Sequence, residues 1–186
     1  MITVVPETYT KVEYDVGELR ECAERALGRI PSLADGLDVE IRIDEMQATT
    51  RLWIVSLDPL VFELDSGAVE NLRDPRRLGH LEAEVAFSRL FLELTDRWSD
   101  AFGAPALGAD VSHAHRMAWD VNLYGRVGRL GLRLHTPRFR YNFRNRHGFS
   151  DLADRVFDRL WEADGLTWAQ IVALSDEAID HLVVDN

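Results

Sequence analysis

The sequence contains very little cysteine and almost no lysine. Cys22 is the single cysteine among 186 residues, which excludes a disulfide within the chain and a zinc cluster built from several cysteines. Lys11 is the single lysine, so 20 of the 21 basic residues are arginines. No apolar run approaches the roughly 18 residues that a membrane-spanning helix needs. The first residues also lack the basic and then apolar pattern of a signal peptide. We therefore expect a cytoplasmic protein without a membrane span.

Charge is distributed unevenly along this acidic chain. The formal net charge is -11, yet residues 111–149 contain eight arginines and one acid, Asp120, for a net charge of +7. The remainder of the chain therefore carries a net charge of -18. Such asymmetry is typical of a protein that binds an anionic partner. It is equally compatible with ion pairs formed between the basic segment and the acidic remainder.

Hydrophobic periodicity predicts a mixture of strands and helices. Short apolar or alternating runs predict β-strands at 2–5, 12–16, 39–44, 52–57 and 60–64. Start signals and apolar stripes predict helices near 15–30, 75–102, 112–124, 150–165 and 167–179. We expect a single α+β domain over residues 1–186, in which a small, mostly antiparallel sheet packs on a long central helix and the last two helices form an αα-hairpin.

The most distinctive stretch is 138–147, which reads R-F-R-Y-N-F-R-N-R-H. Successive side chains of a β-strand point to opposite faces of the sheet. A strand here would place the aromatic side chains in the core, namely Phe139, Tyr141 and Phe143. Its other face would carry Arg138, Arg140, Asn142, Arg144 and Arg146. The alternation therefore predicts a cationic strand that joins or flanks the sheet.

Four guanidinium groups on one face repel one another unless anions lie among them. Arginine binds phosphate and carboxylate with planar, often bidentate geometry, so our leading hypothesis is a non-enzymatic binding or regulatory protein for an anionic small molecule or an acidic protein partner. The candidate ligand-binding residues are Arg138, Arg140, Arg144, Arg146, His147, Arg126 and Arg129. The alternative is that acids of the chain itself supply the anions, because buried charges are normally paired. The overall acidity argues against nucleic acid as the partner, and the sequence leaves self-association open.

Histidines and a glutamate provide a second hypothesis, a metal-dependent hydrolase. His80 and Glu84 are four residues apart on the predicted helix 75–102, so they share one face of it. His113 and His115 form an H-x-H pair that could place two imidazoles on one metal ion if it were extended. Such a mixed set of ligands resembles those used for zinc or iron, and zinc is the cofactor that we assign to this hypothesis. The order helix, three strands, helix resembles that of small zinc peptidases, although their H-E-x-x-H motif is absent.

Overall fold

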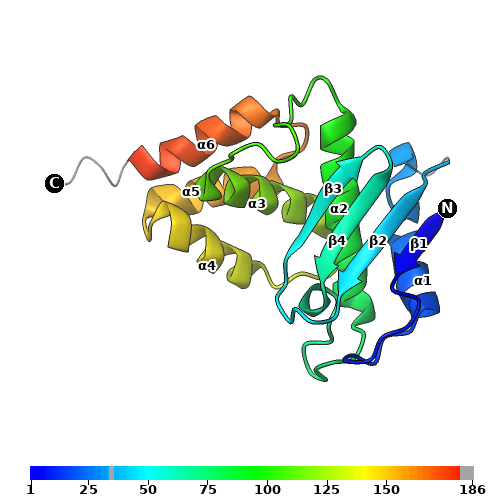
Figure 1. The fold of residues 1–186 in the computed structure, drawn as a ribbon. Helices are drawn as coiled ribbons and strands as arrows, with labels where there is room; N and C mark the ends of the chain where they lie inside the picture. The colour runs from blue at the N-terminus through cyan, green and yellow to red at the C-terminus, as the bar shows by residue number, and fades with distance from the viewer. Residues whose placement is uncertain (34–35, 181–186) are drawn as a thin grey trace. The chain divides into compact units, whose positions relative to one another are not determined.

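The computed structural model of the protein describes residues 1–33 and 36–180. It is an α+β protein with one mixed sheet, and within the described residues this sheet has four strands and is accompanied by six α-helices (Figure 1). The chain divides into two compact units, Met1–Thr95 and the segment from Asp96 onward. The single domain over residues 1–186 stays a prediction. Within the described residues, no helix is both long enough and apolar enough to cross a membrane.

The first unit is built around the sheet. Its strands are β1 (Ile2–Val5), β2 (Val39–Asp44), β3 (Leu52–Leu57) and β4 (Leu60–Asp65). Its helices are α1 (Val16–Gly28) and most of α2 (His80–Trp98), with short 3₁₀ turns at Pro31–Leu33 and Ser66–Ala68. The strand order is β1-β2-β4-β3. β1 pairs parallel with β2, β2 pairs parallel with β4, and β3 pairs antiparallel with β4.

The prediction of a mostly antiparallel sheet is therefore wrong, since two of the three pairings are parallel. The reason lies in the connections. Helix α1 joins β1 to β2, and a helical crossover is the usual connection between neighbouring parallel strands. β3 and β4 are joined by a tight turn at Asp58-Pro59, which makes an antiparallel pair and leaves β3 at the edge. Alternation of apolar residues shows which face of a strand is buried, but it carries no information about strand direction.

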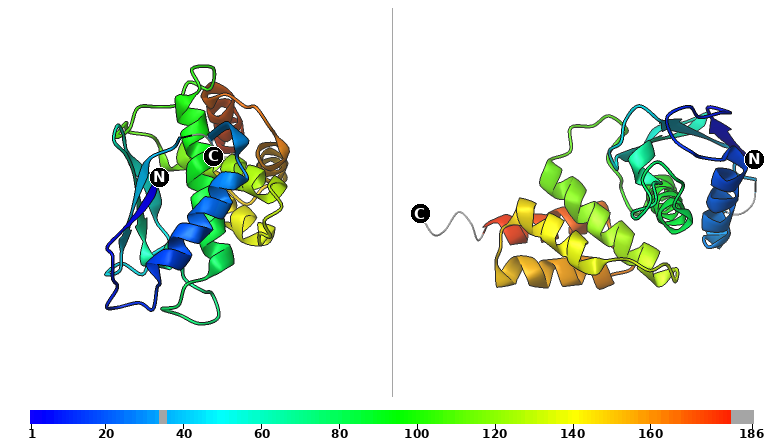
Figure 2. Two further views of the ribbon diagram at one scale, coloured as in Figure 1. Left: turned by 90° about the vertical axis from the view of Figure 1, so that its right-hand side faces the viewer. Right: turned by 90° about the horizontal axis from the view of Figure 1, so that it is seen from below.

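Both helices of this unit cover the same face of the sheet, as the right-hand view of Figure 2 shows. Val39, Ile41 and Ile43 of β2 point into this core, and Phe62 of β4 meets Phe91 of α2 edge-to-face at 5.5 Å between ring centroids. Helix α1 contributes an apolar stripe that includes the buried Cys22. Burial raises the pKa of the Cys22 thiol to about 11, so this cysteine is a small core residue and not a reactive thiolate.

Helix α2 is shorter than predicted and shares its role with α1. It has 19 residues, beginning at His80 and ending at Trp98, whereas the sequence suggested 75–102. Before this helix, the Asn71 side chain accepts hydrogen bonds from the backbone N–H groups of Arg73 and Asp74. This local turn holds the segment before α2 in a loop. The helix is thus one of two that pack on the sheet.

The second unit is helical. It contains α3 (His113–Arg129), α4 (Thr136–His147), α5 (Asp151–Glu162) and α6 (Trp168–Asp180). Helix α3 packs against the other three, and α5 packs against α6 as the predicted pair of C-terminal helices. The core is rich in aromatic residues, with Trp119, Phe143 and Phe157 fully buried. Trp119 Nε1 donates to Asp96 Oδ2 at 2.9 Å, which satisfies the one polar atom of that ring.

Candidate functional site

The predicted strand at 138–147 is wrong, because this segment forms helix α4, Thr136–His147. Pro137 lies in the first turn, where a helix tolerates proline because the first N–H groups have no partner within the helix. The side chains that point toward neighbouring helices recur every four residues rather than every two. They are Phe139, Phe143 and His147. The strand interpretation placed all four arginines of this segment on one face, whereas the helix divides them between two sides.

The inner side of α4 is part of the core. Phe143 is fully buried and stacks on His147 at 3.8 Å between ring centroids. His147 is fully buried as well, and its Nε2 lies 2.8 Å from the Ser175 hydroxyl while its Nδ1 lies 3.2 Å from the Phe143 carbonyl oxygen. Burial lowers the pKa of His147, and nearby His115 lowers it further, which outweighs the opposing effects of the Phe143 carbonyl and Asp176. His147, one of the predicted ligand-binding residues, is thus a neutral core residue.

Two of the predicted arginines face α5 and are paired there. Arg144 binds Asp154 in a bidentate manner, with Nε 2.7 Å from Oδ1 and Nη2 2.5 Å from Oδ2. Arg140 binds Asp158 through Nη2 and donates to the Asp154 carbonyl oxygen at 3.3 Å. The hydrogen bond from Arg144 lowers the pKa of Asp154 and raises that of Arg144. The spacing is reciprocal, because Arg140 and Arg144 are four residues apart on one helix and their acids are four apart on the next.

The guanidinium groups of Arg140 and Arg144 also contact aromatic rings. The Arg140 guanidinium carbon lies 4.4 Å from the ring centroid of Phe157, and that of Arg144 lies 6.0 Å from the ring of Phe149. Cation–π contacts and ion pairs together hold these two arginines against their own unit. For Arg140 and Arg144, the interpretation in which the chain supplies its own anions accounts for the charge.

Arg126 and Arg129, the helper residues of the predicted site, are also engaged within the second unit. Arg126 Nη1 lies 2.7 Å from Oδ1 and 2.9 Å from Oδ2 of Asp96. Arg129 donates to the Trp161 carbonyl oxygen at 2.6 Å and to Asp164 Oδ1 at 2.8 Å. Both arginines therefore stabilise helix packing on α3.

The outward side of α4 differs from its inner side. Five exposed residues follow one another at helical spacing and form what we call the outer face of α4: Arg138, Tyr141, Asn142, Asn145 and Arg146. Among the described residues, Arg138 and Arg146 have no ion pair or hydrogen-bond partner for their side chains, and the same holds for Arg133 just before the helix. Within the part of the chain that the structure describes, the arginines of α4 without an ion pair therefore lie on this face.

An aromatic pair lies beside these arginines. The Tyr141 side chain is 58% exposed and that of Phe149 is 65% exposed, and their rings meet edge-to-face at 6.0 Å. The strand interpretation placed Tyr141 in the core and gave Phe149 no role. The signal that would have found them is the combination of Pro137 with the i, i+4 recurrence of apolar side chains, which is typical of a helix start followed by one buried stripe.

The four residues of the predicted metal site lie on two helices, His80 and Glu84 on α2 and His113 and His115 on α3. Glu84 receives hydrogen bonds from Arg25 at 2.7 Å and Arg29 at 3.0 Å. Burial raises the pKa of Glu84, but these two arginines outweigh it and the pKa is lowered. The His80 Nε2 lies 3.2 Å from Glu18.

His113 and His115 begin helix α3, and side chains two residues apart on a helix do not face each other. His115 Nε2 instead lies 2.7 Å from Asp176 Oδ1. Within the described part of the chain there is no group of three or more histidine, cysteine or acidic side chains that could hold a metal ion. Among these described residues, His80, Glu84, His113 and His115 therefore do not form one set of metal ligands.

Comparison with protein-family models, with curated proteins and with solved structures found no match, so the argument for a function rests on the residues of this chain.

Proposed function

We propose that the protein is a non-catalytic binding protein that docks an acidic segment of a partner protein on the outer face of α4. One observation carries the proposal. In a chain whose net charge is -11, Arg133, Arg138 and Arg146 remain unpaired within the described residues. The face that carries Arg138 and Arg146 also carries the exposed Tyr141, whose ring meets that of Phe149. Arginine and tyrosine are the residue types that contribute most to protein–protein interfaces, and carboxylates of a partner complement the free guanidinium groups.

The spacing of the arginines favours an extended ligand over a small anion. Arg138 and Arg146 are eight residues apart on one helix, which corresponds to about 12 Å along its axis. A single phosphate or carboxylate group cannot bridge that distance, whereas about four residues of an extended peptide span it. The two amides of Asn142 and Asn145 lie between the arginines and can pair with the backbone of such a peptide.

The sign of the total charge argues for a protein partner over nucleic acid. A polyanion of high charge density is repelled at long range by a protein of charge -11, and this repulsion opposes the local attraction of three arginines. A short acidic peptide segment carries fewer charges, so the local contacts dominate. The exposed rings of Tyr141 and Phe149 add apolar contact area that a peptide side chain can cover.

Fluorescence anisotropy with a labelled heptaglutamate peptide tests the proposal, with heptaglutamine as the uncharged control. We expect saturable binding of heptaglutamate alone. The double variant Arg138→Gln/Arg146→Gln should weaken it by about tenfold, which corresponds to about 1.4 kcal/mol. The matched variant Arg140→Gln/Arg144→Gln removes the same charge from the same helix, but it should lower thermal stability and change the affinity of the folded protein by no more than about twofold.

Equal weakening in both double variants would show that total charge, and not the outer face, attracts the peptide. Absence of saturable binding would overturn the proposal. A ten-nucleotide oligothymidylate serves as the nucleic-acid arm. Tighter binding of this oligonucleotide than of heptaglutamate, sensitive to Tyr141→Ala, would identify single-stranded nucleic acid as the partner and contradict the protein-partner assignment.

A further inference from the structure

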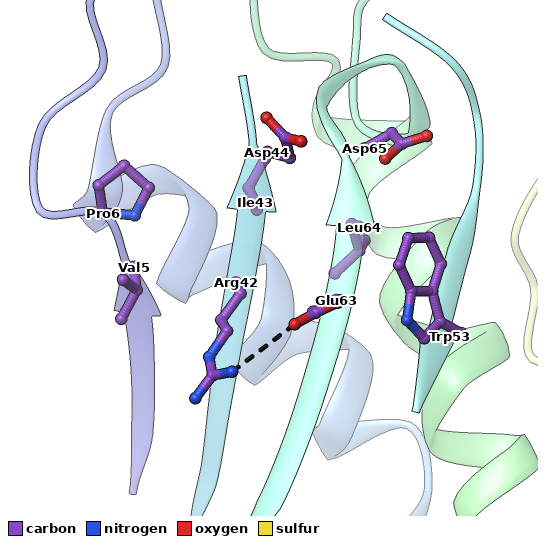
Figure 3. Close-up of a pocket in the computed structure, with 9 residues that line it drawn as sticks. All are labelled: Val5, Pro6, Arg42, Ile43, Asp44, Trp53, Glu63, Leu64 and Asp65. Carbon is purple, nitrogen blue, oxygen red and sulfur yellow. Dashed lines mark ion pairs between the residues drawn. The ribbon is translucent and has the colours of Figure 1, made fainter. Parts of the chain in front are cut away.

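The face of the sheet that faces away from α1 and α2 carries a pocket of about 300 Å³, within the first unit (Figure 3). The strand register arranges its side chains in two rows. One row crosses all four strands and consists of Val5, Arg42, Glu63 and Trp53. The next row lies at the carboxyl ends of the parallel strands β2 and β4, where Asp44 and Asp65 are register partners. A volume of this size suits a small ligand or a single large side chain.

The pocket is acidic, because Arg42 is the only basic residue among those that line it and three carboxylates accompany it. Arg42 is already bound by carboxylates on both sides. Its Nε lies 2.5 Å from Glu40 Oε1, and its Nη1 lies 3.6 Å from Glu63 Oε1. This pairing leaves the carboxylates of Asp44 and Asp65 at the upper end of the pocket. Asp65 is ion-paired with Arg51, whereas Asp44 has no ion pair within the described residues. Figure 3 shows their carboxylates at the ends of the neighbouring strands.

Asp65 is the unusual member of this pair. Its side chain is only 2% exposed, although it lines the pocket. Both hydrogen bonds that it accepts, from the Thr49 hydroxyl and from Arg51 Nε, go to Oδ2. Within the described residues, Oδ1 accepts none. This oxygen therefore remains available to accept a hydrogen bond from a ligand in the pocket that Asp65 lines. Asp44, on the adjacent strand, accepts one hydrogen bond at Oδ1, from the Met46 N–H at 2.8 Å.

Like charges at paired positions of neighbouring strands destabilise a sheet unless a cation lies between or beside them. The chain itself shows which cation fits. Arg51 reaches over the edge of the site, where its guanidinium carbon lies 6.0 Å from the Trp53 ring centroid and its Nε lies 2.9 Å from Asp65. Trp53 and Asp65 thus already accommodate one guanidinium group, by a cation–π contact and an ion pair.

We infer that this pocket is a binding site for an alkyl guanidinium or ammonium group. The cationic head lies at Asp44 and at the free Oδ1 of Asp65, and the stem lies against the ring of Trp53. The site is independent of the outer face of α4, since it belongs to the other unit and selects the opposite charge. The shared chemistry is that of a free amine or guanidine and of a basic side chain in a peptide.

Isothermal titration with L-argininamide, using the full chain, tests the inference. We expect saturable binding to the wild type and at least about tenfold weaker binding to Asp44→Asn. Asp38→Asn is the matched control, because Asp38 is exposed and directly precedes the same strand at its other end. This control should bind L-argininamide as the wild type does. Thermal unfolding of both variants checks that they are folded.

Titrations with two further ligands distinguish a small-molecule cation from a basic side chain of a peptide. A capped Gly-Arg-Gly tripeptide that binds more tightly than L-argininamide identifies a peptide side chain as the ligand, whereas tighter binding of L-argininamide identifies a small molecule. Glutamine amide, which lacks the charge, should not bind. The inference is overturned if L-argininamide shows no saturable binding, or if Asp38→Asn weakens it as much as Asp44→Asn does, which would indicate general attraction to an acidic protein.

Discussion

The two sides of α4 carry the same residue type in different electrostatic situations. On the side toward α5, Arg140 and Arg144 meet Asp158 and Asp154 and lie over aromatic rings. On the outer face, Arg138 and Arg146 meet no acid among the described residues. All four arginines contribute equally to the net charge of the segment. The pairing of each arginine, and not the number of arginines, distinguishes a packing role from a binding role.

The comparison also explains why composition alone was ambiguous. The segment 111–149 has a net charge of +7, but several of its arginines serve helix packing. Arg126 and Arg129 hold α3 to Asp96 and to the end of α5 in the same way. A charge excess in sequence therefore overstates the charge that a partner meets. The part that remains on the outer face of α4 is smaller, but it is concentrated beside two exposed rings.

The largest expected effect is a difference in stability between two variants, one that lacks an aromatic ring on the inner side of α4 and one that lacks a ring on its outer face. Phe143→Ala removes a fully buried ring that stacks on His147, and it should lower the free energy of unfolding by about 3–5 kcal/mol. Tyr141→Ala removes an exposed ring two residues away and should change it by no more than about 0.5 kcal/mol. Urea denaturation monitored by circular dichroism measures both. Similar losses for the two variants would contradict the assignment of inner and outer sides.

The next effect concerns pH. The pKa of His147 is lowered in the folded state, so its contribution to stability is complete above its unfolded value of about 6.5 and is lost progressively as the pH falls below it. Each unit of separation between the folded and unfolded pKa is worth about 1.4 kcal/mol. We expect the urea midpoint to fall between about pH 7 and pH 5, and His147→Gln to reduce that fall.

A second, more acidic step should come from the paired side of α4. The pKa of Asp154 is lowered by Arg144, so this contribution is present above the unfolded value of about 3.9 and is lost as the pH falls through the folded pKa. Asp154→Asn should remove this step and leave the step near neutral pH. His115→Gln is the control for the upper step, because His115 is the other histidine near His147. If His115→Gln alone abolished the upper step, the assignment to His147 would be wrong.

The smallest expected effect is a gain in affinity for heptaglutamate when the paired arginines of α4 are released from their acids. Asp154→Asn/Asp158→Asn removes the acids that hold Arg140 and Arg144, so the affinity for heptaglutamate should rise by about two- to threefold while thermal stability falls. Glu24→Gln/Asp38→Asn changes the net charge equally at exposed positions of the first unit and should leave both quantities nearly unchanged. Anisotropy and thermal unfolding measure the two quantities. Unchanged affinity in the first variant would show that arginines outside the outer face do not contribute even when they are released.

Local sequence signals predicted several elements correctly. Asp15 caps α1 by accepting a hydrogen bond from the Glu18 N–H at 2.9 Å, and Ser150 caps α5 in the same way at Ala153. Thr167 and Gln170 form a capping box before α6, with hydrogen bonds of 2.8 and 3.3 Å, at the start of the predicted helix 167–179. The strands 39–44 and 52–57 have the predicted bounds. These features depend on residues close together in the chain, which is why pattern and spacing suffice for them.

The candidate sites depended on contacts between distant residues. The alternation at 138–147 satisfies the period of a strand, but a four-residue recurrence is present in the same letters, and the packing of Phe143 on Phe157 and His147 on Ser175 selects the helix. The sheet pocket combines residues from all four strands through a mixed parallel and antiparallel register that apolar patterning does not encode.

By itself, the sequence determined the α+β class, three of the helix caps, four of the strand segments and the presence of a basic region in an acidic chain, whereas the predicted strand at 12–16 is wrong. These are consequences of local hydrogen bonding, hydrophobic periodicity and composition, which act over a few residues. Only the tertiary structure decided the direction of the strands, the helical state of 138–147 and the pairing of each arginine. Those outcomes depend on burial and charge compensation between segments far apart in the chain, and the energy of a charge is set by what surrounds it after folding.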